Sequence, residues 1–279
     1  MIRAVPIARR SSRTATASGR PGPHVVTPNW VAPGLLLRHD VYVTADAAGR
    51  ERVPERVMAL AAGRELRPVW RNDFGGLTYE IVGAGQFVKW SRDSRLDLAA
   101  EAARLRWAVK YVPVPRVLAA GRDGGEEWLL TAALPGQSAV AERWRADPAT
   151  ASAAIGAGLR ALHDRLPVAD CPFSWSVETR LARVNKPVEL SEPPPIDRLV
   201  VCHGDACSPN TLIDDAGKCS GHVDFGEMGV ADRWADLAIA TWSTEWNYGP
   251  GWEGVVLDAY GIAADPSRIT YYRRLWEIT

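Results

Sequence analysis

Two acidic motifs constrain this chain more than any other feature of its sequence. The first, HGDACSPN, spans residues 203–210 and directly follows an apolar run that predicts a β-strand. The second, DFG, begins fourteen residues after Asn210. The residues between them predict a hairpin that turns at 215–217. Such a hairpin would return Asp224 to a position beside the first motif.

Three side chains of these motifs have the chemistry of a phosphoryl-transfer site. Phosphoryl transfer depends on positioning and charge neutralisation. A carboxylate must meet the hydroxyl that receives the group, and oxygen donors must hold Mg²⁺. Asp205 is the candidate base, and Asn210 and Asp224 are the candidate metal ligands. Each alone is an ordinary loop residue, but their joint spacing between predicted strands favours a common site.

A lysine and a glutamate upstream match what such a site requires. Lys89 lies in a predicted strand (86–90), and Glu101 follows twelve residues later in a predicted helix (96–110). The lysine would reach the α- and β-phosphates of a nucleoside triphosphate, and the glutamate would hold the lysine in place.

Gly75 and Gly76 lie in the turn 72–76, ahead of this strand. Because glycine has no Cβ, the turn can bring backbone N–H groups close to phosphate.

The remaining pattern predicts a β-rich half followed by a helix-rich half. Strands are predicted at 68–72, 77–81, 86–90, 112–121, 126–134 and 198–202. Helices are predicted at 53–62, 96–110, 147–166, 232–246 and 267–279. The first 50 residues are expected to form an N-terminal extension. Residues 1 to about 30 are rich in Arg, Ser and Thr, a composition that favours disorder.

Composition narrows the class of protein in three ways. The 279 residues include 33 acidic and 33 basic ones, whereas a nucleic-acid binder usually has a basic excess. Four cysteines without a CxxC pair are typical of reduced thiols in a cytoplasmic protein. No run reaches the roughly 18 apolar residues that a membrane span needs. We therefore expect neither a nucleic-acid partner nor a membrane partner.

Together the motifs resemble the aminoglycoside phosphotransferase family, and most closely its 3′-phosphotransferase branch. The resemblance rests on FVKW (87–90), LAAEAARLRW (98–107), WLLTAALPG (128–136), LRALH (159–163), CPF (171–173), VVCHGDACSPN (200–210), GHVDFG (221–226), GVADRWADLAIAT (229–241) and AYGIA (259–263). That family is similar to protein kinases in fold. The resemblance therefore implies an α+β, two-lobe fold, with a small antiparallel β lobe (51–134) and a helical lobe (135–279).

The resemblance also implies roles for the nucleotide-side residues. Lys89 contacts the phosphates of ATP or GTP and pairs with Glu101, while Ala132 and Leu134 belong to the hinge that takes the base through backbone groups. Asp205 acts as the base, and Mg²⁺ binds Asn210 and Asp224. His163 and Asp236 are expected to be structural.

The implied acceptor is an aminoglycoside, phosphorylated on its 3′-hydroxyl. Glu277 and Thr279 match acceptor-site positions of the family. A polycationic sugar also favours an acidic, aromatic surface, for which the C-terminal part offers a set of candidates. These are Glu245, Trp246, Tyr248, Trp252, Glu253 and Asp258. Core packing and a solvated surface explain the same residues equally well.

Two departures leave the acceptor open. Glu227 stands where this branch usually has arginine, which puts an anion near the phosphates. The stretch between Phe173 and His203 is short, and residues 183–197 read as a Pro-rich linker. One alternative is a small-molecule kinase of the same fold with another acceptor. A less favoured alternative is a nucleotide-binding regulator without transfer.

Overall fold

The computed structural model describes residues 52–72 and 74–279. The predicted extension up to residue 50 and the turn residue Asp73 lie outside the described residues.

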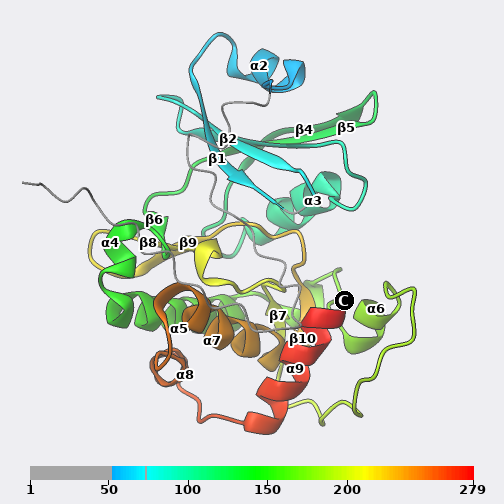
Figure 1. Cartoon of the computed structure of the whole chain (residues 1–279), viewed down its shortest axis with the longest axis vertical. Coiled ribbons are helices and arrows are strands. Elements are labelled where there is room, and N and C mark those ends of the chain that lie inside the picture. The colour runs from blue at the N-terminus through cyan, green and yellow to red at the C-terminus, as the bar shows by residue number, and fades with distance from the viewer. Residues whose placement is uncertain (1–51, 73) are drawn as a thin grey trace, which may run out of the picture. The chain divides into compact units, whose positions relative to one another are not determined.

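The β-rich half is a five-stranded antiparallel sheet in the order β1-β2-β3-β5-β4 (Figure 1). Its strands are β1 (Leu66–Arg71), β2 (Leu77–Ile81), β3 (Gln86–Ser91), β4 (Val117–Asp123) and β5 (Glu126–Ala132). The five strands predicted here are all present. β4 begins five residues later than predicted, because Pro113 and Pro115 cannot donate to a strand ladder.

Two helices accompany the sheet. Helix α2 (Glu55–Ala61) packs on it through an apolar cluster that includes Val57, Tyr79 and Val88. Helix α3 (Leu98–Ala108) begins at Asp97, whose carboxylate accepts from the Ala100 N–H at 2.8 Å. The apolar face of α3 enters a different cluster, the main core, which continues through the helical half. The sheet and the helical half are therefore connected through α3.

The helical half contains the predicted long helices and several short elements. Its helices are α4 (Glu142–Arg145), α5 (Pro148–Arg165), α6 (Val177–Leu181), α7 (Trp234–Tyr248), α8 (Glu253–Tyr260) and α9 (Pro266–Ile278), with 3-10 turns η1 (Val168–Asp170) and η2 (Ser208–Asn210). The strands β6 (Gln137–Ser138), β8 (Thr211–Ile213) and β9 (Cys219–His222) form a small sheet, and β7 (Leu199–Cys202) pairs with β10 (Gly229–Asp232). Sequence analysis missed α4, α6, α8, β6 and β10.

The hairpin between the two acidic motifs is present. Strands β8 and β9 pair antiparallel, and the chain turns between Asp214 and Lys218. The predicted start of α5 is also confirmed, because the Asp147 carboxylate accepts from the Thr150 N–H and Pro148 occupies the first turn. Among the described residues, no helix combines the length and apolar composition needed to cross a membrane.

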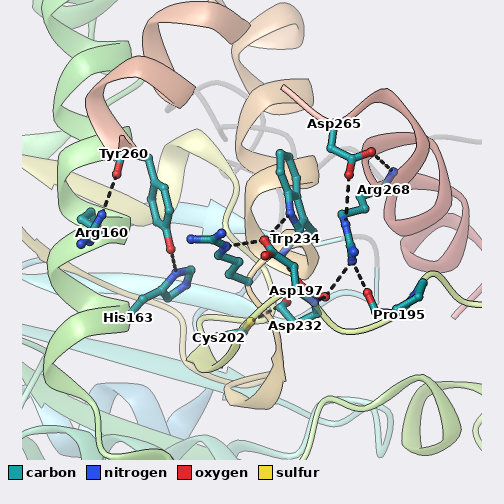
Figure 2. Close-up of polar contacts among 11 residues, drawn as sticks. Arg160, His163, Pro195, Asp197, Cys202, Asp232, Trp234, Tyr260, Asp265 and Arg268 are labelled. Carbon is teal, nitrogen blue, oxygen red and sulfur yellow. Dashed lines mark hydrogen bonds and ion pairs between the residues drawn. The ribbon is translucent and has the colours of Figure 1, made fainter. Parts of the chain in front are cut away.

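The Pro-rich segment is irregular from residue 184 to residue 198, but its end is firmly attached. The Asp197 carboxylate accepts from Arg233 Nε at 2.7 Å and Trp234 Nε1 at 3.0 Å, as Figure 2 shows. Arg268 of α9 donates to the Pro195 carbonyl at 2.5 Å and to Asp232 at 3.1 Å. The segment is therefore fixed against α7 and α9 rather than being a free linker.

Helices α5 and α8 approach so closely that glycine is required between them. A Cβ built on Gly156 of α5 would lie 2.1 Å from the carbonyl oxygen of Val256 in α8. Backbone cannot move aside as a flexible side chain can, so the helices would have to separate.

We expect Gly156→Ala to lower the free energy of unfolding by about 1–3 kcal/mol through overpacking, despite the better helix propensity of alanine. Gly254→Ala in α8 is the matched control, because a Cβ at Gly254 meets no atom within 4 Å. Urea unfolding of both variants tests this. Equal stability of the two would contradict the argument.

Candidate active site

Strand β3 and helix α3 bring together the lysine and the glutamate that the sequence singled out. Lys89 Nζ lies 2.8 and 3.0 Å from the two carboxylate oxygens of Glu101, which is buried. The same nitrogen lies 3.0 Å from Asp224 Oδ1, which belongs to the helical half. One ammonium group therefore lies between two carboxylates and joins the two halves of the site.

These charges shift one another's pKa values. Burial alone would lower the pKa of Lys89, but the Asp224 and Glu101 carboxylates raise it above its usual value. Burial raises the pKa of Glu101. For Asp224 the attraction of Lys89 outweighs burial and lowers the pKa. The lysine is therefore charged, and it favours the ionised form of Asp224.

Asp205 and Asn210 lie in one loop between β7 and β8. Asn210 Nδ2 donates to the Asp205 backbone carbonyl at 3.0 Å and to its Oδ2 at 3.2 Å. The Cys207 thiol donates to Asp205 Oδ1 at 3.0 Å. Burial, followed by the charge of Asp224, raises the pKa of Asp205. Since the Asn210 amide nitrogen faces Asp205, its Oδ1 is the atom suited to a metal ion.

The buried carboxylate of Asp236 holds the backbone of the loop that carries Asp205. Asp236 accepts from the backbone N–H groups of His203 at 2.6 Å and Gly204 at 2.9 Å. His163 Nε2 lies 2.9 Å from the same carboxylate, and its Nδ1 lies 2.9 Å from the Tyr260 hydroxyl, a contact drawn in Figure 2. The structural roles expected for Asp236 and His163 agree with these contacts.

Asp224 itself adopts a backbone conformation that few side chains tolerate. Its φ is +64°, in the left-handed region where aspartate is one of the more tolerated residues. The next residue, Phe225, is fully buried with its ring 4.7 Å from that of His203. Phe225 therefore fixes the turn that carries Asp224 against the loop that carries Asp205.

The N–H groups of the glycine turn are bonded within the turn. Asn72 Oδ1 accepts from the N–H groups of Phe74 at 3.1 Å and Gly76 at 2.7 Å, and the Asn72 carbonyl accepts from Gly75 at 3.0 Å. The Asn72 side chain satisfies two of these N–H groups and its backbone carbonyl the third, so all three point into the turn. A Cβ on Gly76 would lie 2.5 Å from Leu96 Cδ1, so the Leu96 side chain would have to move to admit one.

One backbone donor of the predicted hinge is bonded to the residue that precedes a neighbouring strand. The Ala132 N–H donates to the Arg116 carbonyl at 2.9 Å, so this donor is already used within the sheet. Leu134 follows the end of β5, and its side chain lies against Gly221.

The predicted acceptor residues are only partly brought together. Glu277 faces Arg274 at 3.4 Å, and Glu253 pairs with Arg273 at 2.6 Å, so two of the expected acids have cationic partners. The Trp246 ring lies 4.8 Å from that of Trp242 and 6.0 Å from that of Trp276, tilted against each.

Other C-terminal candidates serve the fold or lie apart from these contacts. The Tyr248 hydroxyl donates to the Ala139 carbonyl at 2.8 Å, which makes it a structural contact. Trp252 lies at the start of α8, and Glu245 and Asp258 are exposed.

Glu227, the anion that stands where this branch usually has arginine, is paired with two arginines. Its Oε2 accepts from Arg180 Nη1 at 2.5 Å and from Arg183 Nη1 at 2.6 Å. Both arginines lie in or just after α6, a helix that sequence analysis missed. The two arginines, three residues apart in 177–183, were the available signal for a one-sided basic helix.

A sheet lysine that reaches an aspartate of a helical half across such a loop is the arrangement of kinase-like phosphotransferases. Comparison with known proteins agrees. The model of the phosphotransferase enzyme family matches residues 65–188 and 187–272. An aminoglycoside 3′-phosphotransferase of Streptomyces fradiae is 34% identical over 257 residues, covering 76% of this chain and 94% of the relative. A streptomycin 3″-kinase of Streptomyces griseus is 33% identical, covering 78% and 93%.

Solved structures extend this likeness to the fold. An aminoglycoside phosphotransferase, APH(3″)-Id of Streptomyces rimosus, superposes with a TM-score of 0.64 at 26% identity, covering 81% of this chain and 99% of that one. An aminoglycoside 3′-phosphotransferase of type VIII gives a TM-score of 0.61 at 27% identity, covering 86% and 94%. The chain belongs to the phosphotransferase enzyme family, among the aminoglycoside phosphotransferases, and has their kinase-like two-lobe fold.

We expect Asp236→Asn to lower the free energy of unfolding by about 2–3 kcal/mol, the size of hydrogen bonds to a buried charge. Asparagine would turn an amide N–H₂ toward groups that now donate to the carboxylate. Asp164→Asn is the control, because Asp164 pairs with Arg160 and Arg198 in a partly exposed position, where ion pairs contribute little. Chemical denaturation of both measures the difference.

The pH dependence of that difference has a definite sign. Burial opposes ionisation of Asp236, but the contacts with His163 and the loop lower its pKa below the usual value. The stabilisation is therefore fully present above the usual aspartate pKa and is lost as the pH falls through the lower, folded value. A stability difference between Asp236→Asn and Asp164→Asn that grew as the pH fell would contradict this assignment.

Proposed function

We propose that the protein is a nucleotide-dependent aminoglycoside kinase that transfers a γ-phosphate to a hydroxyl group, with the 3′-hydroxyl as the first candidate. The observation that carries the proposal is the Lys89 ammonium, held between Glu101 and Asp224 beside the loop of Asp205 and Asn210. Positioning and charge neutralisation of this kind are what phosphoryl transfer requires.

The donor is ATP or GTP. The relative from Streptomyces rimosus has been solved in complex with ADP and streptomycin, which supports a nucleotide as the donor here. Lys89 would bind the α- and β-phosphates, and Glu101 would hold the lysine in place. The backbone of Ala132 and Leu134 would contact the nucleotide base. The turn of Gly75 and Gly76 would close over the phosphates once its N–H groups are no longer bonded to Asn72.

A divalent cation fits the oxygen donors of the loop. Asp224 offers a carboxylate and Asn210 an amide oxygen, which are the hard ligands that Mg²⁺ takes together with phosphate oxygens. When bound, Mg²⁺ would neutralise charge on the phosphates. Burial, followed by the charge of Asp224, raises the pKa of Asp205, so a cation bound at these two carboxylates would offset their repulsion.

Asp205 would act on the acceptor. The acceptor oxygen forms a bond to the γ-phosphorus, the bond from that phosphorus to the β–γ bridging oxygen breaks, and the hydroxyl proton passes to the Asp205 carboxylate. Burial raises the pKa of Asp205, which makes the carboxylate a better proton acceptor. Asn210 and Cys207 orient it through the hydrogen bonds described above.

The acceptor class rests on the relatives, several of which are named aminoglycoside 3′-phosphotransferases. A 3″-hydroxyl is the second candidate, because the streptomycin 3″-kinase is as similar to this chain as they are. Glu277 and Thr279 would contribute to the acceptor site. We place this activity in the cytoplasm, with small molecules as partners and neither nucleic acid nor membrane involved.

A panel assay tests the proposal. Purified protein with Mg²⁺ and either ATP or GTP is incubated with neomycin, kanamycin, streptomycin and choline, and products are located by mass spectrometry and ³¹P NMR. We expect a phosphorylated aminoglycoside, loss of turnover with EDTA and recovery with Mg²⁺. Phosphorylation of choline alone, or none across the panel, would overturn the proposed acceptor class.

We expect Asp205→Ala to lower turnover by about 100-fold or more while nucleotide affinity stays the same, as for loss of a positioned base. Asp215→Ala is the control, because Asp215 is an exposed aspartate of the β8–β9 turn. Steady-state kinetics and nucleotide titration by calorimetry measure both. Weakened nucleotide binding with unchanged turnover would contradict the assigned role.

We expect Lys89→Ala to act mainly on the nucleotide, raising its KM by about tenfold or more, since the ammonium that would bind the phosphates is removed. Lys110→Ala removes an exposed lysine after α3 and should leave the KM unchanged. An acceptor KM that rose while the nucleotide KM stayed constant would show that the lysine has a different role.

A further inference from the structure

One buried guanidinium connects the acceptor side of the site to the turn after Asp224. Arg180 lies in α6, and its side chain is only 6% exposed. Its Nη1 donates to Glu227 Oε2 at 2.5 Å, and its Nε donates to Thr279 Oγ1 at 2.9 Å. Figure 1 shows α6 beside the end of α9, in agreement with the second bond.

The same guanidinium also reaches the catalytic loop through an aromatic ring. It lies 4.8 Å from the ring centre of Trp175, a cation–π distance. The Trp175 indole N–H donates to the Gly204 carbonyl at 3.0 Å, next to Asp205. Gly204 has a φ of +85°, and a Cβ there would lie 2.1 Å from the Glu227 carbonyl oxygen. The loop, the turn and α6 therefore pack as one unit.

The turn of residues 227–228 is also attached to helix α3. Arg104 of α3, the helix that carries Glu101, donates to the Met228 carbonyl at 2.9 Å. Residues 227–228 thus contact α3 through Met228 and α6 through Glu227. Arg183 adds a second cation on Glu227, but both partners of that pair are about 40% exposed, and exposed ion pairs contribute little.

We propose that Arg180 is a positioning residue for acceptor binding, and that Glu227 is the residue that fixes it. The pair fixes the positions of α6 and the end of α9 relative to the loop of Asp205. The side of the site that would contact the acceptor is then held in one geometry relative to the Asp205 carboxylate. The kinetic consequence rests on the proposed function, because it concerns the acceptor, whereas the attachment of α6 does not.

The contrast between the two arginines makes the proposal specific. Arg180 is buried and Arg183 is 40% exposed, although both donate to the same half-exposed Glu227 carboxylate. Loss of Glu227 takes an anion from a buried guanidinium, which is costly, whereas loss of Arg183 removes only an exposed partner. Glu227→Gln should therefore affect the site, and adding Arg180→Met should cost little more, while Arg183→Gln should have little effect.

The test uses Glu227→Gln, Arg180→Lys, Arg180→Met with Glu227→Gln, and Arg183→Gln as the matched control. We expect Glu227→Gln to raise the acceptor KM about tenfold while kcat and the nucleotide KM change less than about twofold. Arg180→Lys should be milder, and the double variant no worse than about twice the effect of Glu227→Gln, as for residues in one unit. An equal rise in both KM values, or an unchanged acceptor KM, would overturn the proposal.

Amide hydrogen exchange gives a second measurement that needs no acceptor. In Glu227→Gln the amides of residues 177–182 should exchange about tenfold faster than in the wild-type protein, while those of β7 stay protected. If the wild-type protein phosphorylates no aminoglycoside, the proposed function fails and this measurement still decides whether the pair holds α6. Unchanged exchange in 177–182 would overturn the proposal.

Discussion

The position of the Lys89 ammonium between Glu101 and Asp224 is the interaction on which the rest of the site depends. It joins a strand of the sheet, the helix beside that strand and the turn after β9 at one atom. Burial alone would lower the pKa of this lysine, but the two carboxylates outweigh burial, so the cation persists. A buried charge without a partner is costly. Glu101 is buried and Lys89 and Asp224 are partly exposed, so Glu101 is the group that depends most strongly on this contact.

Two further charged groups extend this constraint into the helical half. The Asp236 carboxylate fixes the loop that holds Asp205 by accepting two backbone N–H bonds, which are short and directional. The Arg180 guanidinium attaches α6 to the turn after Asp224. The sheet, the loop of Asp205 and α6 are thus connected by polar contacts, and apolar packing of α3, α5 and α7 supports them.

Much of the architecture was predictable because long elements carry a strong periodic signal. The sheet strands and the helices α3, α5, α7 and α9 follow from apolar spacing, and the Asp147–Pro148 start of α5 follows from capping chemistry. The short helices α4 and α6 were missed, since a helix of one turn gains too little from its own hydrogen bonds and is decided by packing. The Pro-rich segment was recognised as irregular, but its attachment through Asp197 was not.

Local sequence was enough to group the site residues into two sets, Lys89 with Glu101, and Asp205 with Asn210 and Asp224. Within each set a strand end or a short hairpin leaves few alternatives, because the members lie within twenty residues of one another. The folded chain was needed to show which groups meet across longer separations. Arg180 and Glu227 are 47 residues apart, and Arg104 and Met228 are 124 apart. A charged side chain interacts strongly only with polar or oppositely charged groups that the fold brings within a few ångströms. Spacing along the chain does not specify which groups those are.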